Sequence, residues 1–503
     1  MDQRPRDIAD GDSPPRPARR PFWKRRWVRI VLGLIMVLVI VVGPWPAYEG
    51  DPNGDYARAT RARLETMALS STQGPALAGA AAVEITPPLG EPLAGYSARS
   101  PKASDALGDR LWAKALSVSN ARQTVTIVGG DILLILPHLR DAILARAGVA
   151  RPEVYFTATH THSGPGGFSP RWLEQISLGG YDRSIVDRLA KAFAEAITRS
   201  RAAMRPAKIV VTCAVPKADL VVNRMDATAP GNSRLTCLNV LEPDGRHIAG
   251  LVTFNAHPTC LGHHSHAISG DYPGMVQREL ARRFGGTWLF AVGATGSMKP
   301  ATTRPRGPER LQDVARKVFA IAEPLAASAL SGAPGSTRPA VDNGKVLPQN
   351  TLRNTASRYH VGSARSEATL ACGILEVDLP QTQYRISSGW RLSPIMTSLI
   401  HARQSYIHVV RINGMVFLGM PGDYSGELSS RLSRHVGPGA AGAGDNVLIP
   451  VITSFNGDYI GYLIPHERYA QDRYESRDAN FFGPWCGEYF HDLSVRLIER
   501  LSG

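Results

Sequence analysis

Two histidines that lie two residues apart form the segment with the clearest chemical meaning. The stretch 154–167 reads VYFTATHTHSGPGG, in which a run typical of a β-strand leads to His160 and His162 and a Gly/Pro turn follows. In an extended strand this spacing places both rings on the same face. Open α/β sheets bind ligands beyond the ends of their strands, so the segment predicts a ligand site there. The Lys-Ser/Thr pair of a phosphate-binding P-loop is absent.

A further histidine follows a second predicted strand. His257 stands just after the apolar run 248–255, and His263, His264 and His266 lie beyond it. Neutral imidazole is the commonest metal ligand, and two or three imidazoles with a carboxylate form a typical catalytic zinc set. A single histidine at a strand end is more often a hydrogen-bonded structural residue. Two such positions in one chain favour a shared zinc site.

The elements that must position these histidines alternate between strands and helices. Apolar runs predict strands at 125–129, 154–158, 209–215, 248–255, 288–292, 407–412, 415–420 and 447–453. The four-residue spacing of Ile185, Leu189, Phe193 and Ile197 predicts a helix with one apolar face. This alternation predicts an α/β fold with a mixed β-sheet core flanked by helices. Asn413-Gly414 predicts a hairpin turn, and no internal repeat is apparent in the sequence.

Six short motifs occur along the chain in a fixed order. They are ITPPLG near residue 85, THTHSGPGG at 159–167, NAHPT at 255–259, SGDYPG at 269–274, MPGD at 420–423 and GYLIPHERYAQDRY at 461–474. Together they resemble the neutral/alkaline non-lysosomal ceramidases and their bacterial relatives, which are zinc-dependent amidohydrolases. The resemblance covers about residues 79 to 484. It implies a ceramidase-like catalytic domain over 79–503, without the C-terminal immunoglobulin-like domain of the long ceramidases.

The resemblance implies one zinc ion and four ligands from distant parts of the chain. These ligands are His160, His257, Asp423 and Tyr462. Ceramidases have a glutamate where this chain has Asp423, so the backbone must approach the ion about one methylene closer. Such an ion lowers the pKa of a bound water to roughly 7, which supplies a nucleophile near neutral pH. The alternatives are that Asp423 caps a turn and that Tyr462 is a structural tyrosine.

The resemblance also implies three further groups in the active site. His162 and Tyr474 are expected to move protons or stabilise an oxyanion, and Arg224 is expected to hold a polar or anionic head group. An ordinary surface ion pair between Arg224 and Asp226 is the alternative for the arginine.

The chain departs from the ceramidase pattern at the active-site serine of that family. Ceramidases carry Gly-Asp-Val-Ser-Pro there, whereas residues 293–300 read GATGSMKP. An ungapped match places Lys299 at the serine, and a two-residue slip would instead make Ser297 its equivalent. We favour the ungapped match, in which water is the nucleophile and Lys299 binds a negatively charged group that ceramide lacks.

The N-terminus has the pattern of a membrane anchor. Residues 19–29 are strongly basic, and residues 30–47 contain no charge. Eighteen residues without a charge are close to the length that spans a bilayer as a helix. We expect a cytoplasmic tail over 1–29, a single transmembrane helix over 30–48, a connector over 49–78, and a catalytic domain in the periplasm or outside the cell. A cleaved signal peptide is the alternative.

Charge and cysteine content narrow the choice of partners. The net charge of +14 favours an anionic membrane surface or acidic ligands. The folded part has no dense Lys/Arg block with interleaved aromatic residues, which argues against nucleic acid. The five cysteines are far apart and contain no C-x-x-C pair, which excludes a zinc ribbon and a dense disulfide scaffold.

These observations predict a zinc-dependent hydrolase that cleaves the N-acyl amide of ceramide or a related N-acylated lipid at a membrane. One alternative is a hydrolase of a different ester or amide; a serine hydrolase is disfavoured because G-x-S-x-G is absent. The other is a non-catalytic envelope protein that binds lipid, which the departures at Asp423 and Lys299 would favour. The sequence does not indicate an oligomeric state.

Overall fold

The structure is a computed structural model of the 503-residue chain. It describes residues 26–99, 102–229, 231–330, 340–342, 345–347, 356–436 and 448–502. The predicted basic tail therefore lies almost entirely outside the described residues. Most of the stretch 330–350, whose Pro, Gly and Ser content is typical of a surface loop or linker, lies outside them as well.

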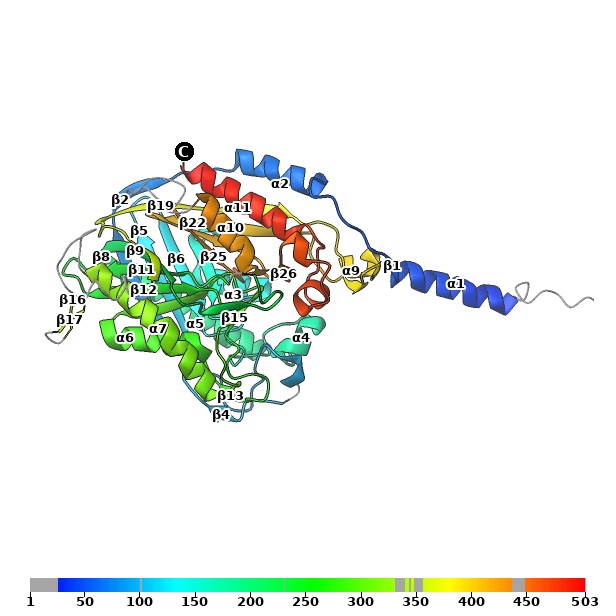
Figure 1. The fold of residues 1–503 in the computed structure, drawn as a ribbon, viewed down its shortest axis with the longest axis horizontal. Helices are drawn as coiled ribbons and strands as arrows, with labels where there is room; N and C mark the ends of the chain where they lie inside the picture. Colours follow the sequence, from blue (N-terminus) through cyan, green and yellow to red (C-terminus); the bar gives the residue numbers. More distant parts are fainter. Residues whose placement is uncertain are drawn as a thin grey trace, which may run out of the picture.

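Three five-stranded sheets form the body of the molecule, and each is built by the same succession of elements (Figure 1). Three antiparallel strands are followed by a helix and by a fourth strand, which pairs in parallel with the third. A second helix then follows. We call each such succession a unit.

The three units follow one another along the chain. Unit one contains β3 (Leu77–Glu84), β5 (Trp112–Ser119), β6 (Thr124–Gly130), α3 (Pro137–Ala147), β7 (Val154–Ala158) and α5 (Arg183–Ala202). Unit two contains β9 (Lys208–Pro216), β11 (Leu235–Leu241), β12 (His247–Phe254), α6 (Asp271–Phe284), β14 (Thr287–Val292) and α7 (Pro308–Leu330). Unit three contains β19 (Glu367–Asp378), β22 (Gln404–Ile412), β23 (Met415–Gly419), α10 (Gly426–Val436), β25 (Ile449–Thr453) and α11 (Cys486–Ser502).

Shorter elements complete the sheets and link the units. The fifth strands of the three sheets are β8 (Arg205–Pro206), β18 (Ala356–Val361) and β2 (Thr72–Pro75). Two-stranded pairs are formed by β4 (Ala106–Leu107) with β13 (Ala267–Ile268), β10 (Val221–Asn223) with β15 (Met298–Pro300), β16 (Ala340–Asp342) with β17 (Lys345–Leu347), and β24 (Asp423–Tyr424) with β26 (Tyr462–Leu463). Short helices are α4 (Trp172–Leu178), α9 (Pro394–Ser398), η2 (Ser97–Arg99), η3 (Arg151–Glu153), η4 (His466–Arg468) and η5 (Tyr474–Asp478).

The inner faces of the three sheets pack against one another in a shared core. Alternate strand residues supply it, among them Leu116, Ile127, Leu251, Val410 and Phe417. Because each strand turns every second side chain inward, one sheet face serves this core and the other is left for the helices. Fully burying one such side chain stabilises the fold by about 1.5–3 kcal/mol.

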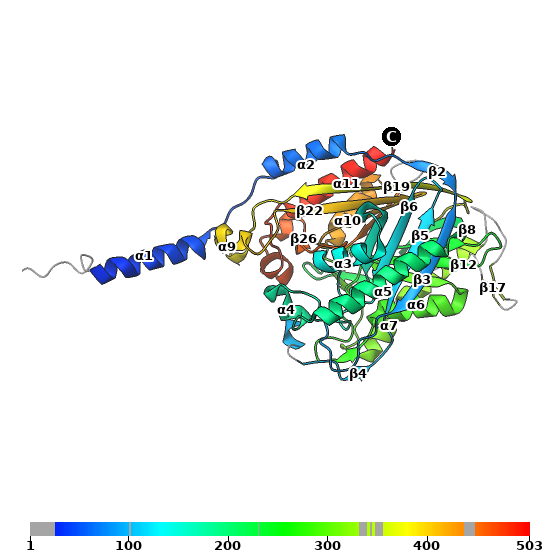
Figure 2. The same cartoon turned by 180° about the vertical axis from the view of Figure 1, so that it is seen from behind.

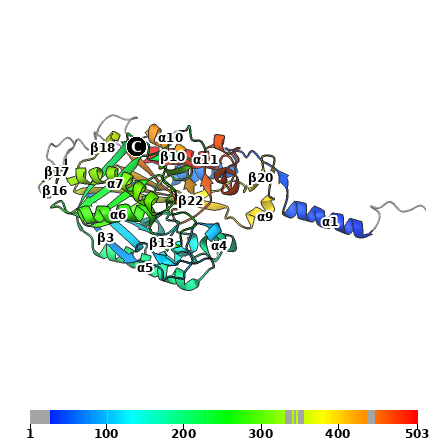
Figure 3. The ribbon, with the colours of Figure 1, turned by 60° about the horizontal axis from the view of Figure 1, so that its bottom comes forward.

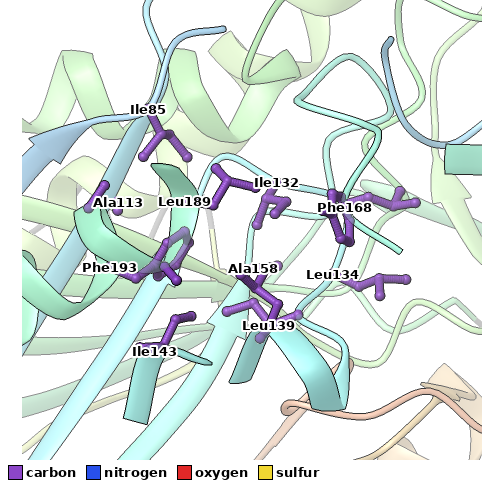
Figure 4. Packing of buried hydrophobic residues seen from close by; sticks show 14 of the residues in the cluster. Ile85, Ala113, Ile132, Leu134, Leu139, Ile143, Ala158, Phe168, Leu189 and Phe193 are labelled. Carbon is purple, nitrogen blue, oxygen red and sulfur yellow. The ribbon is translucent and has the colours of Figure 1, made fainter. Parts of the chain in front are cut away.

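The outer face of each sheet is covered by the two helices of its own unit. In unit one, Leu139 and Ile143 of α3 and Leu189 and Phe193 of α5 pack over the sheet (Figure 4). Seen from below, α6 and α7 lie side by side and α5 lies along β3 (Figure 3). The helix predicted from the four-residue spacing that begins at Ile185 is therefore confirmed.

The predicted mixed sheet core with flanking helices is confirmed, and so is the hairpin at Asn413-Gly414, which joins β22 to β23. The structural repeat was missed. Its units share strand order and helix placement without a visible common sequence pattern, because many different apolar residues satisfy the same strand pairings.

The transmembrane helix expected over 30–48 is not confirmed. Helix α1 covers Arg26–Val41 and projects from the body (Figure 2). Gly43 and Pro44 follow it, and the chain then forms the short strand β1 (Trp45–Pro46), which pairs with β21 (Trp390–Arg391) next to β20 (Arg385–Ser387). Proline lacks an amide donor and ends helices. In the part of the chain that the structure describes, no helix is long and apolar enough to cross a membrane.

Helix α2 (Asp55–Thr66) lies within the stretch 49–78 that was expected as a connector. It packs against β19 and α11 through Ala57, Thr60 and Leu64, which are buried. The remainder of that stretch includes β2, the edge strand of the third sheet.

Candidate metal centre

A group of buried polar residues lies where the third and fourth strands of the three units end. His160 comes two residues after β7, His257 three residues after β12 and Asp423 four residues after β23. Each unit thus contributes one of these side chains. The candidate centre depends on the convergence of the three sheets.

Hydrogen bonds join the loops that leave these strands. The side-chain amide of Asn456, after β25, donates to the carbonyl of Phe156 in β7 at 2.7 Å. The amide of Gly296, after β14, donates to the carbonyl of Tyr424 at 2.9 Å. A Cβ atom on Gly296 would lie 2.4 Å from the carbonyl oxygen of Asp423. Glycine at position 296 therefore permits this loop to lie close against the backbone of Asp423.

Asp423 and Tyr462 are placed side by side by a short parallel ladder. They are direct partners in the pairing of β24 with β26, and the Asp423 amide donates to the carbonyl of Gly461 at 2.9 Å. Both side chains are buried, with exposed fractions of 1% and 6%. This one strand pairing brings together two residues that are far apart in the sequence.

His160 is held in a fixed orientation by three contacts. Its backbone has a φ of 59° and its amide donates to the carbonyl of Ile132 at 3.1 Å. The Nδ1 hydrogen is directed at the carbonyl of Leu133 at 2.7 Å, and the ring stacks on Phe455 with centroids 4.0 Å apart. Because a carbonyl can only accept, Nδ1 carries the hydrogen and Nε2 presents a lone pair. That lone pair is available to a metal ion.

His162 has a matching orientation. Its Nδ1 atom lies 3.0 Å from the carbonyl of Gly95, and its Nε2 atom lies 3.4 Å from Nε2 of His160. The expectation that both histidines share one strand face is wrong, because β7 ends at Ala158 and His160 adopts a left-handed backbone. The turn after the strand brings the two nitrogen atoms together instead.

His257 completes the set of imidazoles. Its Nδ1 atom is directed at the carbonyls of Thr295, at 3.0 Å, and Met298, at 3.2 Å. Its Nε2 atom lies 3.1 Å from Oδ2 of Asp423 and 3.4 Å from the hydroxyl of Tyr462. The possible ligand atoms of His160, His162 and His257 all lie within 4.8 Å of one another.

The protonation states of these groups leave an excess of lone pairs. Burial lowers the pKa of His160 to about 3, and burial with the neighbouring imidazoles holds the pKa of His162 well below its usual value. Burial alone would raise the pKa of Asp423, but His257, His160 and Thr295 outweigh it, so the pKa lies below the usual range for aspartate. At neutral pH, the neutral imidazoles of His160 and His162 therefore lie beside an ionised carboxylate. Lone pairs at these distances repel unless a cation lies between them.

The residues around this cluster match what metal ligands require. Each imidazole is fixed through its Nδ1 hydrogen by a backbone carbonyl, and Thr295 donates its hydroxyl to Oδ1 of Asp423 at 2.7 Å. Such partners orient ligands and select the metal-binding tautomer. The nitrogen and oxygen donors suit zinc among the common divalent ions.

Arg224 reaches the cluster through the phenol of Tyr462. Its Nη2 atom donates to the Tyr462 hydroxyl at 3.3 Å, and its Nε atom lies 2.9 Å from a carboxylate oxygen of Glu475. Asp226 pairs instead with Arg468 at 2.7 Å, so the alternative of a surface pair between Arg224 and Asp226 is not what the structure shows. Burial and the charge of Asp423 raise the pKa of Tyr462 far above its usual value, and Arg224 opposes that rise.

Tyr474 lies between the cluster and the surface. Its ring centroid is 5.7 Å from that of Tyr462, and its side chain is 58% exposed. It is therefore the one predicted site residue whose ring both contacts this set of side chains and extends well into solvent.

Ser297 and Lys299, the two candidates for the position of the ceramidase serine, have different environments. Ser297 is fully buried, and its hydroxyl lies 3.1 Å from that of Ser425. Lys299 lies on β15 opposite Val222 and is exposed, whereas its neighbours Met298 and Pro300 are buried. Catalytic roles for either residue stay predictions.

Three residues of the site were missed by the sequence analysis: Thr295, Phe455 and Glu475. Thr295 lies within the GATGSMKP stretch, and Glu475 is adjacent to the predicted Tyr474, so proximity to predicted residues could have indicated both. The residue type of Phe455 gives no indication that it belongs to the site. Its role as the ring beneath His160 depends on a left-handed backbone with a φ of 63°.

Comparison with known protein families and sequences agrees with the resemblance seen in the motifs. Residues 77–288 match the family model described as neutral/alkaline non-lysosomal ceramidase, N-terminal. The neutral ceramidase of Pseudomonas aeruginosa is 23% identical over 474 residues, which cover 81% of this chain and 70% of that protein. The neutral ceramidase of Mycobacterium tuberculosis is 23% identical over 428 residues, which cover 71% of this chain and 66% of that protein.

Solved structures show the same fold. The crystal structure of the Pseudomonas aeruginosa neutral ceramidase matches with a TM-score of 0.63 at 19% identity, over 85% of this chain and 75% of that one. A structure described as ceramidase complexed with C2 matches with a TM-score of 0.64 at 19% identity, over 85% of this chain and 76% of that one. The expected ceramidase-like fold is confirmed.

Proposed function

Because the chain belongs to the neutral/alkaline ceramidase family, we propose that it is a zinc-dependent hydrolase that cleaves the N-acyl amide of ceramide or a related N-acylated lipid. One observation carries the proposal. The Nε2 atoms of His160 and His162 face each other at 3.4 Å, His257 Nε2 lies 3.1 Å from Asp423, and the possible ligand atoms of the three histidines all lie within 4.8 Å of one another. A divalent cation would convert the repulsion between these atoms into four favourable contacts.

His160, His257, Asp423 and Tyr462 are proposed to hold the ion. His162 lies within the same 4.8 Å group of ligand atoms and is either a fifth donor or a proton acceptor. When bound, zinc would polarise the amide carbonyl and lower the pKa of a water molecule to about 7.

The protein's own side chains suit the remaining steps of amide hydrolysis. The neutral His162 ring, fixed by the carbonyl of Gly95, can accept a proton at Nε2 and return it to the leaving amine. Arg224 holds positive charge beside the Tyr462 oxygen and would stabilise its phenolate form. Tyr474, at the exposed edge, can donate its hydroxyl hydrogen to the substrate.

We also propose that the protein is attached to a membrane with its catalytic part outside the cytoplasm. Every residue from Ile30 to Val41 except Gly33 carries an exposed apolar side chain, so α1 has no polar face after its first turn. A helix of this kind is stable when it is buried in lipid or protein. The basic residues that precede it favour the cytoplasmic side.

The proposal is tested by metal analysis and a panel of N-acyl lipids. We expect about one zinc per chain and hydrolysis that is lost on chelation and restored by added zinc. His160→Ala should lose both metal and activity, whereas His264→Ala, which changes an exposed histidine, should keep both. Turnover that survives complete removal of metal would refute the proposal. Stoichiometric zinc without turnover of any lipid would favour the non-catalytic alternative.

A serine hydrolase is not favoured by the site. The hydroxyl of Ser297 is paired with Ser425 rather than with an imidazole that could remove its proton.

A further inference from the structure

The end of the molecule from which α1 leaves carries an exposed apolar surface. Its large side chains are Trp172 and Ile176 on α4, Ile386 on β20, Trp390 on β21, Ile395 on α9 and Leu399 directly after α9; they are between 46% and 83% exposed. We call this set the apolar end. The elements α4 and α9 lie on the side of the body that faces α1 in all three views (Figures 1, 2 and 3).

The apolar end is tied directly to the base of α1. The Ser393 amide donates to the carbonyl of Val42 at 3.0 Å, and its hydroxyl donates to the carbonyl of Ile40 at 2.8 Å. Strand β1 pairs with β21, which carries Trp390. The base of α1 therefore adjoins α9 and β21, which carry part of the apolar end.

The apolar end also borders the approach to the candidate centre from two sides. On one side, Arg385 of β20 donates to the carbonyls of Tyr469 and Gln471, in the segment that leads to Tyr474. On the other side, α4 packs against η2, next to Tyr96, whose ring lies 4.8 Å from that of His162. The surface thus extends from the partly exposed edge of the site to the helix that leaves the body.

We propose that the apolar end docks on the surface of a lipid bilayer, so that an N-acylated lipid enters the site from the membrane without crossing water. The substrate in this inference rests on the function proposed above. A bilayer is the occupant favoured by the structure because α1 is apolar on every side from Ile30 to Val41 and leaves the body at this end. Exposed tryptophans suit the interfacial region, and Arg403 and Arg473, both exposed, can meet anionic head groups.

Hydrogen exchange of the full chain on vesicles tests the docking directly. With vesicles of phosphatidylcholine and phosphatidylglycerol, we expect slower exchange at 172–178 and 386–399 as well as in α1. Residues 356–361, where Tyr359 is also exposed but belongs to the edge strand of the second sheet, should be unchanged. Protection confined to α1 would overturn the proposal. Protection that grows with protein concentration in the absence of vesicles would do so too, because it would identify a second copy of the chain as the occupant.

A matched pair of variants tests the consequence for substrate entry. Trp172→Asp combined with Leu399→Asp should weaken use of vesicle-embedded ceramide by at least about tenfold, since two carboxylates would face anionic head groups. Hydrolysis of a short-chain, water-soluble analogue should stay within about twofold, and Tyr359→Asp should change neither. Equal losses with both substrates would contradict the proposal. A wild-type chain that hydrolyses neither substrate contradicts the proposed function, and the exchange experiment then still decides the docking.

Discussion

Units one and three place a buried carboxylate after the same strand, and the two carboxylates have opposite electrostatic environments. Asp131 directly follows β6 and is 2% exposed, and Asp423 follows β23 and is 1% exposed. Asp131 accepts hydrogen bonds from the Trp112 amide and the Gln277 side chain, each at 3.0 Å. Burial raises its pKa, whereas the pKa of Asp423 is lowered.

The difference shows that burial and strand position do not by themselves make a metal ligand. Asp131 is satisfied by two neutral donors, and it has Lys114 nearby as a compensating charge. One oxygen of Asp423 accepts from Thr295, and the other lies 3.1 Å from Nε2 of His257. Only the arrangement at Asp423 leaves one carboxylate oxygen available to a cation.

Removing the carboxylate of unit three should have the largest effect. Asp423→Ala is expected to lose zinc and to reduce turnover by more than about 100-fold, the upper range for residues that merely support a ligand. Zinc per chain and hydrolysis of an N-acyl lipid are measured together. Asp131→Ala is the matched control and should retain its zinc. Full metal content in Asp423→Ala would show that the carboxylates of the two units do not differ in metal binding.

Thr295→Val should have the next largest effect. The substitution leaves Oδ1 of Asp423 without its donor, so zinc affinity should fall by about 10–100-fold. Competition with a chelator of known affinity measures the change. Thr295→Ser restores the hydroxyl and should recover most of the affinity. If serine fails to rescue the affinity, packing of the methyl group rather than the hydrogen bond orients the carboxylate.

Asp131→Ala should affect stability rather than chemistry. The Trp112 amide and Gln277 would lose their buried acceptor, which costs about 1–3 kcal/mol in the free energy of unfolding. Denaturant unfolding with and without zinc measures this loss. An unchanged midpoint together with lost activity would show that unit one also supplies a group to the reaction.

Ser297→Ala should have the smallest effect. Its hydroxyl contacts only Ser425 among the described side chains, so turnover should fall by less than about tenfold, the equivalent of one neutral hydrogen bond. Steady-state kinetics on the same lipid measures it. A loss as large as that of Asp423→Ala would instead support a serine nucleophile.

Much of the fold and of the site could be predicted from local patterns. Apolar periodicity located α5 and most inner strands, and the motif resemblance selected His160, His257, Asp423 and Tyr462, which the structure brings together. Zinc binding by these four residues stays a prediction. The resemblance was informative because each proposed ligand lies in a strand or within three residues of the end of one, where backbone geometry is constrained.

What could not be predicted depends on long-range contacts. The pairing of Asp423 with Tyr462 joins two short segments with no alternating pattern of their own. The stacking of Phe455 on His160 requires left-handed backbones at both residues, which neither residue type indicates. The pair Gly43-Pro44 indicates that a helix ends near Val41. The uncharged run continues past these two residues, however, and it favoured a longer helix in the sequence analysis.

The shared inner core makes the catalytic part of the chain indivisible. The segment matched by the family model, 77–288, contains unit one and stops inside β14 of unit two. A fragment of that length would hold two of the four proposed ligands. It would also leave the inner sheet faces, which Val410 and Phe417 of unit three normally cover, open to water. We therefore expect such a truncation to aggregate. Unlike a chain of separable modules, this chain must complete its last sheet before the four proposed ligands can come together.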